Sequence, residues 1–170
     1  MNMETDNGVE TFLSFRLSEE VFAINVAQVL NILEMSHITA IPKAPDYMKG
    51  VINLRGTVLP VVDLRTLFRL PEKETTVDTS IIVLSINLNN ESVLVGILVD
   101  AVREVLELKN SEISPAPSIG TKYNSAFIKS MWRTDDKFIM ILDIDKVFST
   151  EEIIDLKEHQ SLAEKSINNG

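Results

Sequence analysis

The chain has 170 residues, a length that suggests one domain or two small ones. Its formal net charge of −9 repels phosphate backbones and anionic membrane surfaces, so we expect no nucleic-acid partner and no direct membrane insertion. It contains no cysteine, which excludes disulfides, a thiolate nucleophile and zinc–cysteine sites. The first residues lack a signal-peptide pattern, and no apolar run approaches the roughly 20 residues of a membrane helix, so we expect a soluble, cytoplasmic protein.

The chain opens with a polar leader at residues 1–10 and continues with two short strand-like runs. "TFLSFRL" (11–17) alternates apolar and polar residues, the period of a half-buried strand, and "VFAIN" (21–25) follows as the second arm of a hairpin. We then expect a short helix over 26–33, capped by Asn25, because four apolar residues recur there at helical spacing. These four are Val26, Val29, Leu30 and Leu33.

The middle of the chain is predicted to be almost entirely extended. Prolines disfavour helix over 37–45, and Pro60 indicates an edge or a bulge in its strand. Strands rich in apolar and β-branched residues are expected at 51–55, 58–64, 79–87, 91–102 and 103–109. Their densest positions are predicted to be core: Ile82, Val83, Leu84, Val95, Ile97 and Val99.

The last part of the chain is predicted to hold a loop, a hairpin and a helix. Serine, proline and glycine mark 110–125 as loop, and "AFIKSMW" (126–132) and "FIMILDI" (138–144) form the hairpin. A C-terminal helix is expected from Ser149, with acidic residues in its first turn.

One short sequence pattern occurs twice. "VDLRTLF" (62–68) and "LDIDKVF" (142–148) both read apolar, Asp, apolar, two polar, apolar, Phe, and each follows a β-rich run. Two copies of strand, Asp and short helical turn suggest two similar small β units. Many short strands separated by turns favour a β-barrel or β-sandwich class.

Catalytic chemistry has little support in the sequence. Asp63, Asp100 and Asp143 each end an apolar run, and we interpret them as caps of the following turn rather than as a carboxylate dyad. His37 and His159 have no acid at ligand spacing, so no metal site is expected, and no glycine-rich cradle indicates a cofactor. We therefore predict no catalytic residue, no metal and no cofactor. A β-barrel hydrolase using the aspartates is kept as the alternative from another class.

Arg55, followed by Gly56, is the best-defined surface feature. It lies between two apolar runs, as the tip of a hairpin. Pattern alone favours an exposed turn arginine. The functional alternative is a charge that anchors a partner helix, with Gly56 allowing close backbone approach.

Four stretches, taken in order, resemble the CheW family of chemotaxis coupling proteins. They are "GVINLRGTVLPVVDLRTLF", "LVGILVDAVREVLEL", "SPAP" and "FIMILDIDKVF", and the likeness runs from about Phe12 to Phe148. The resemblance implies two five-stranded SH3-like β-barrels that share an apolar core, with short helices and a C-terminal helix. We divide the chain accordingly into a leader (1–10), a CheW-like domain (11–148) and a C-terminal helix and tail (149–170). Ser130 departs from the glycine that the family commonly has before its last hairpin.

The resemblance also implies a function and its residues. CheW-like proteins are adaptors that join the cytoplasmic tips of chemoreceptors to the regulatory domain of the histidine kinase CheA, at membrane-associated arrays. In the family the receptor tip docks in the groove between the barrels. The matching receptor-contact positions here are Arg55, Gly56, Val29, Val102 and Val105, and the kinase region includes Thr39, Pro42 and Gly50. An adaptor of a non-chemotaxis array, controlling pili or a second-messenger enzyme, fits the same residues.

Overall fold

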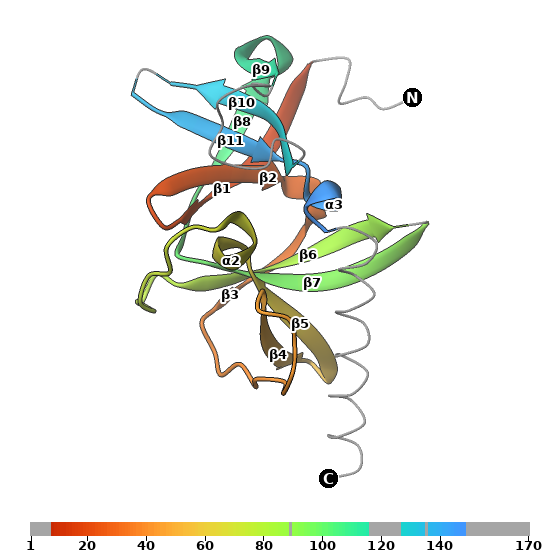
Figure 1. The fold of residues 1–170 in the computed structure, drawn as a ribbon. Helices are drawn as coiled ribbons and strands as arrows, with labels where there is room; N and C mark the ends of the chain where they lie inside the picture. The colour runs from red at the N-terminus through yellow and green to blue at the C-terminus, as the bar shows by residue number, and fades with distance from the viewer. Residues whose placement is uncertain (1–7, 89, 116–126, 135, 149–170) are drawn as a thin grey trace.

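The computed structural model describes residues 8–88, 90–115, 127–134 and 136–148, most of which are strands in two sheets (Figure 1). The bounds in the first sheet are β1 Val9–Leu17, β2 Glu20–Asn25, β8 Ala101–Lys109, β9 Ile113–Pro115, β10 Ile128–Arg133 and β11 Phe138–Leu142. Their spatial order is β8-β1-β2-β11-β10-β9. The three-residue β9 is a sixth strand beyond the five expected in each unit.

The second sheet has five strands among the described residues. Their bounds are β3 Val29–Glu34, β4 Met48–Leu54, β5 Thr57–Asp63, β6 Ser80–Leu88 and β7 Glu91–Val99. Their order is β3-β6-β7-β5-β4, and only β5 and β7 run parallel. The first sheet likewise has one parallel pair, β11 with β2. The two sheets therefore share one plan of pairing.

The two sheets exchange edge strands. The β1–β2 hairpin belongs to the first sheet, but the chain then crosses and β3 pairs with β6 in the second sheet. The β6–β7 hairpin belongs to the second sheet, and the chain then crosses back so that β8 pairs with β1. Each sheet is thus completed by a strand that follows the other sheet's hairpin.

Apolar side chains form one shared cluster and one smaller cluster for each sheet. The shared cluster draws on both sheets and includes Phe15, Phe22, Ile82, Ile97 and Phe148. Phe12, Leu106 and Ile141 belong to the cluster of the first sheet, and Ile52, Val61 and Ile81 to that of the second. The six predicted core residues are all buried. This arrangement confirms the all-β prediction and is consistent with two SH3-like units packed about a common core.

The repeated pattern of the sequence is confirmed as a repeated element. The 62–68 copy ends β5 and forms helix α2 (Leu64–Phe68), while the 142–148 copy ends β11 and forms helix α3 (Ile144–Val147). Each preceding strand is the one that pairs in parallel with its neighbour. The pattern therefore marks the equivalent corner of each unit.

The predicted helix over 26–33 is wrong. Only Val26–Gln28 is helical, as a single 3-10 turn η1, and Val29–Glu34 forms β3. The predicted cap does hold, since the Asn25 side chain accepts a hydrogen bond from the backbone N–H of Ala27 at 2.8 Å. Pairing with β6 supplies backbone hydrogen bonds to this segment, which outweigh its helical spacing of apolar residues.

The remaining expectations concern the 110–125 loop, Pro60 and the two ends of the chain. The predicted loop 110–125 contains the 3-10 turn η2 (Asn110–Glu112) and β9, so its start is wrong, and 116–126 lies outside the described residues. Pro60 lies just before β5 begins to pair with β7, so one side of its strand is still an edge there, as predicted; the nearby bulge is on β4, between Met48 and Gly50. Most of the leader and the C-terminal helix also lie outside the described residues.

Candidate functional site

Arg55 and Gly56 form the two-residue turn between β4 and β5. Both have positive φ, 52° for Arg55 and 84° for Gly56, the pattern of a type I′ hairpin turn. The turn is closed by the backbone N–H of Gly56, which donates to Asn53 Oδ1 at 2.9 Å. The Arg55 side chain is exposed, and no ion pair joins it to another residue of the described ranges. The turn therefore presents a guanidinium that the fold itself does not use.

The left-handed backbone of Arg55 is unusual for that residue. A side chain at positive φ crowds the backbone, and asparagine or glycine is strongly preferred at this turn position. Arginine at this position costs about 1 kcal/mol of folding free energy relative to those residues. A costly residue at an exposed turn points to a role outside the hairpin.

Val29, Val102 and Val105 lie on the two exchanged edge strands. Val29 of β3 is opposite Leu84, and Val102 and Val105 of β8 are opposite Phe15 and Leu13. Each strand has a register shift here, between Val29 and Asn31 on β3 and between Val102 and Val105 on β8. A bulge of this kind re-aims side chains and blocks the addition of a further strand.

Two of these valines border the shared core, and the third is exposed. Val29 and Val102 pack against it while remaining partly accessible. Val105 faces the same way as Leu13, which is 3% exposed, yet Val105 itself is 58% exposed. Val26, Leu30 and Ile32 add exposed apolar surface beside Val29. The edges thus offer apolar surface that continues the core outward.

The predicted receptor residues pack against different apolar clusters. Val29 and Val102 pack against the shared cluster, and Val105 is exposed on the same strand as Val102. Arg55 lies at the tip of the β4–β5 hairpin, and its neighbour Leu54 packs against the same second-sheet cluster as Leu33 of β3. The connection between the two parts of the predicted site therefore runs through that cluster.

Thr39, Pro42 and Gly50 lie at the end of the second sheet. Thr39 and Pro42 are exposed in the segment between β3 and β4, whereas Gly50 is buried. Thr39 and Val51 exchange two backbone hydrogen bonds of 2.9 Å. A Cβ on Gly50 (φ 149°) would lie 2.1 Å from the Thr39 carbonyl oxygen, so the glycine permits this close approach. Gly50 shapes the exposed segment but presents no surface of its own.

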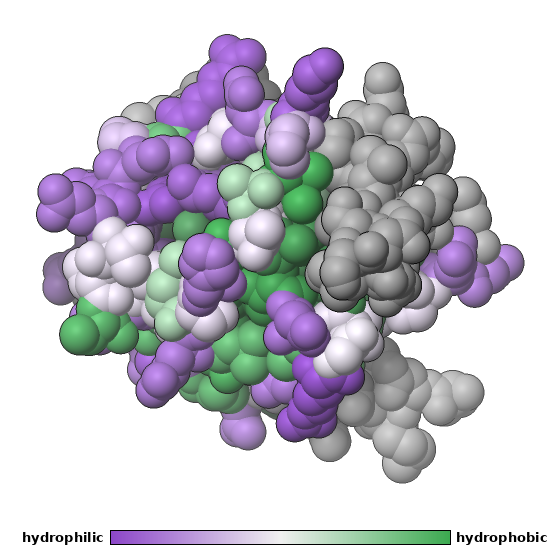
Figure 2. Space-filling model, turned by 90° about the horizontal axis from the view of Figure 1, so that it is seen from below, coloured by the Kyte–Doolittle hydropathy of each residue, from purple (hydrophilic) through white to green (hydrophobic). Residues whose placement is uncertain are grey.

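This end of the molecule has an apolar centre. Leu33, Met35, Ile38 and Leu54 are partly buried around the second-sheet cluster. Figure 2 shows hydrophobic surface in the middle of the lower face, bordered by polar residues. An apolar area with a polar border is typical of a protein-interaction surface.

The strand-end aspartates do not form a dyad, because an arginine lies between two of them. The Arg65 guanidinium donates to Asp63 from Nε at 2.9 Å and from Nη2 at 3.0 Å, and from Nη1 to Asp100 at 2.9 Å. Asp63 also accepts from the backbone N–H of Arg65, which confirms its predicted capping role. Asp100 accepts from the backbone N–H of Ser18 at 2.7 Å. Asp100 is followed directly by β8, and the Asp143 side chain makes no cap hydrogen bond, so the capping prediction is wrong for these two aspartates.

Arg65 is the residue that sequence reasoning missed. It is nearly buried, and burial alone would lower its pKa, but hydrogen bonds and charge from Asp63, with the charge of Asp100, outweigh burial and raise the pKa of Arg65. The group is structural: it joins the end of β5 to the point where the chain crosses from β7 to β8. Only the recurring Asp at strand ends hinted at it.

The described residues offer neither a metal site nor a membrane-spanning helix. No three His, Asp or Glu side chains there could hold one metal ion. The described residues also include no helix long and apolar enough to cross a membrane. His37 is exposed, and His159 lies outside the described residues.

Comparison with known proteins gives a consistent family. The family model described as CheW-like domain matches residues 11–152. The chemotaxis protein CheW of Rhizobium meliloti is 35% identical over 146 residues, which cover 86% of this chain and 92% of that protein. The chemotaxis protein CheW of Bacillus subtilis is 34% identical over 151 residues, covering 89% and 94%. The crystal structure of scaffolding protein TtCheW from Thermoanaerobacter tengcongensis matches with a TM-score of 0.73 at 31% identity, covering 84% of this chain and 94% of that one. The chain therefore belongs to the CheW family.

Proposed function

We propose that the protein is a non-catalytic adaptor that couples chemoreceptor cytoplasmic tips to a CheA-type histidine kinase in chemotaxis arrays on the cytoplasmic side of the membrane. The observation that carries the proposal is the accessible apolar surface on two bulged edge strands: Val29 and Val102 pack against the shared core, and Val105 is exposed beside Val102 on β8. Such a surface suits the apolar face of a helix, since bulges oppose pairing with a strand. Arg55 adds a long stem and a planar charge that can lie against a helix.

We assign the kinase contact to the end of the second sheet, where the segment between β3 and β4 is exposed. Thr39 and Pro42 are exposed there beside the partly buried Leu33, Met35, Ile38 and Leu54. Val102 and Val105 lie on the first sheet, whereas Thr39 and Pro42 lie at the end of the second, and several modest interfaces stabilise an array together.

The aspartates argue against the hydrolase alternative. Asp63 and Asp100 are both held by Arg65, so neither carboxylate is free to share a proton with the other. They are also nearly inaccessible, at 0% and 3% exposure. The geometry is that of a buried ion-pair network.

Val105→Glu tests the receptor surface. We expect it to weaken binding of a receptor signalling-tip fragment at least about tenfold, because it places a charge in an apolar contact, and to leave melting and kinase-domain binding unchanged. The matched control is Val77→Glu, since Val77 is 99% exposed on the loop between α2 and β6 and has no assigned role. Titration calorimetry with each partner measures both affinities. Unchanged receptor binding by Val105→Glu would remove Val105 from the site, and a wild-type protein that binds neither partner would refute the adaptor function.

A further inference from the structure

The bulge on β8 is closed by a side chain from the neighbouring strand. The register of β1 with β8 passes from Phe15 opposite Val102 to Leu13 opposite Val105, which leaves Arg103 and Glu104 outside the regular pairing. Ser14 lies between the two registers on β1. Its Oγ donates to the Glu104 carbonyl oxygen at 2.9 Å and accepts from the Glu104 N–H at 3.0 Å. One hydroxyl therefore pairs with both the N–H and the C=O of Glu104, one of the two residues outside the regular pairing.

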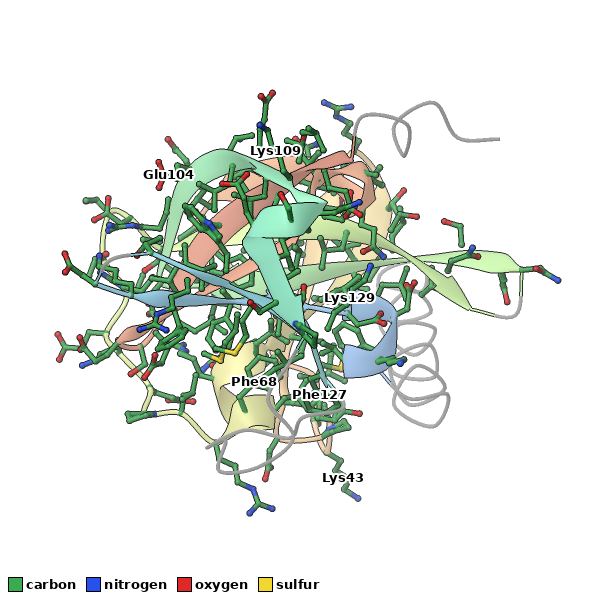
Figure 3. All side chains as sticks on the ribbon, turned by 90° about the horizontal axis from the view of Figure 1, so that it is seen from above. Lys43, Phe68, Glu104, Lys109, Phe127 and Lys129 are labelled. Atoms are coloured by element: carbon green, nitrogen blue, oxygen red, sulfur yellow. The ribbon has the colours of Figure 1, made fainter. Side chains whose placement is uncertain are left out.

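A serine suits this position for a specific reason. A hydroxyl is both donor and acceptor, and its short side chain reaches only a directly adjacent strand. Ser14 is 1% exposed, so water does not replace it from the side of β1. On the outer side, Figure 3 shows Glu104 at the rim of the molecule on β8. Ser14 is thus a buried side chain whose hydrogen bonds hold the accessible segment of β8 around Glu104.

The hydrogen bonds of Ser14 hold the peptide groups directly before Val105. Val105 is the next residue after Glu104 and is opposite Leu13, the residue before Ser14. Val105 resumes the regular pairing directly after the bulge, and its side chain is 58% exposed on this edge strand. The equivalent bulge on β3 has no side-chain hydrogen bond of this kind from the described residues. The two bulges on the edge strands therefore differ in this hydrogen-bonded support.

We propose that Ser14 is a positioning residue for receptor binding: by holding the Glu104 peptide groups it fixes the bulge that presents Val102 and Val105. The inference rests on the proposed function, because it assumes that the β8 edge contacts the receptor. Ser14 itself touches no partner. Its contribution is the orientation of the edge before binding, which reduces the ordering that binding would otherwise require.

The test uses full-length Ser14→Ala with Ser85→Ala as matched control. Ser85 also uses its hydroxyl across a strand pair, to Ser92 at 2.7 Å, but on the exposed face of the β6–β7 hairpin. We expect Ser14→Ala to weaken binding of the receptor signalling-tip fragment about fivefold, with unchanged kinase-domain affinity, and Ser85→Ala to change neither. Ser14→Thr, which keeps the hydroxyl, should restore receptor affinity at least in part.

Amide hydrogen exchange on the unmodified protein provides the second measurement. The Glu104 N–H should be protected, that of Arg103 less so, and the Glu104 protection should disappear in Ser14→Ala. An unprotected Glu104 amide in the wild-type protein would overturn the proposal even if Ser14→Ala failed to fold. Wild-type receptor affinity in Ser14→Ala would also overturn it where Val105→Glu still abolishes binding. If Val105→Glu binds normally as well, the receptor surface is wrong, and the positioning role falls with it.

Discussion

Arg55 and Arg65 carry the same charge in opposite settings. Arg55 is exposed in a left-handed turn and has no ion pair among the described residues, whereas Arg65 is nearly buried between two carboxylates. A buried charge is costly unless it is fully paired, and Arg65 meets this condition through Asp63, Asp100 and the Lys73 carbonyl oxygen at 3.0 Å. The fold depends on one arginine and leaves the other available.

Arg65→Met should destabilise the protein by about 3–5 kcal/mol, because it leaves Asp63 and Asp100 buried without their partner. Urea denaturation measures the loss. The triple variant Arg65→Met, Asp63→Asn, Asp100→Asn removes the unpaired charges and should recover much of it. If Arg65→Met alone unfolds at the wild-type urea concentration, the network contributes little to stability.

Arg55 should show the reverse profile. Arg55→Ala should change the free energy of unfolding by no more than about 0.5 kcal/mol, since both residues meet the same backbone strain. Arg55→Asn should stabilise by up to about 1 kcal/mol, because asparagine tolerates a left-handed turn. Both should reduce receptor-dependent kinase activation in a reconstituted array, and Arg55→Lys should rescue it only partly if the planar guanidinium matters. Normal activation by Arg55→Ala would make this an ordinary hairpin turn.

At the scale of the element, the exchanged edge strands form the predicted receptor surface. Their bulges disrupt regular pairing, and the same irregularity hid β3 from the sequence pattern. Leu30 is an extra residue on β3, so apolar residues on either side of it fall at helical rather than alternating spacing. The β6–β7 pair has no such interruption, and the sequence predicts both strands within a few residues of their bounds.

The candidate site was predictable only where its residues form local patterns. The Arg55–Gly56 turn is visible in the sequence because a turn pair separates two apolar runs. Ser14 and Arg65 are not visible, since their roles depend on Glu104 and Asp100, which lie far away in the chain and reach them only through strand exchange. The arrangement of two similar units is implied by the family resemblance. The seven-residue repeat alone gives only a hint of it.

Gly50 and Gly56 offer a matched pair for testing the end of the second sheet. Both have positive φ, but a Cβ on Gly50 would lie 2.1 Å from the Thr39 carbonyl oxygen, whereas one on Gly56 would meet nothing within 4 Å. Gly50→Ala should therefore destabilise by more than about 2 kcal/mol and weaken kinase-domain binding by displacing Thr39. Gly56→Ala should lose only about 1 kcal/mol from backbone strain. Thermal melting and calorimetry measure both, and equal losses would show that the Thr39 contact is not what requires glycine at position 50.

At the scale of the whole molecule, strand exchange makes the two sheets depend on each other. Residues before the α2–β6 loop supply β1 and β2 to one sheet and β3, β4 and β5 to the other. Residues after it supply the remaining strands of both. Side chains from the two halves also pack together: the rings of Phe68 in α2 and Phe127 before β10 have centroids 5.6 Å apart (Figure 3). Neither half of the chain contains a complete sheet, so 11–148 should act as one cooperative domain.

Dividing the chain in the α2–β6 loop tests this dependence. The break would follow Val77, which is 99% exposed, so the cut itself removes no packed residue. Each fragment alone should be unfolded, because its strands lack the neighbours that bury the shared cluster, which draws on both halves. Mixed in equal amounts, the fragments should regain the native spectrum and bind the receptor tip, with a melting temperature that rises with concentration. Circular dichroism and amide NMR spectra of each fragment and of the mixture measure this. A fragment that gives a dispersed, cooperative spectrum by itself would show that one unit folds independently, and that the exchanged strands join two domains instead of completing one.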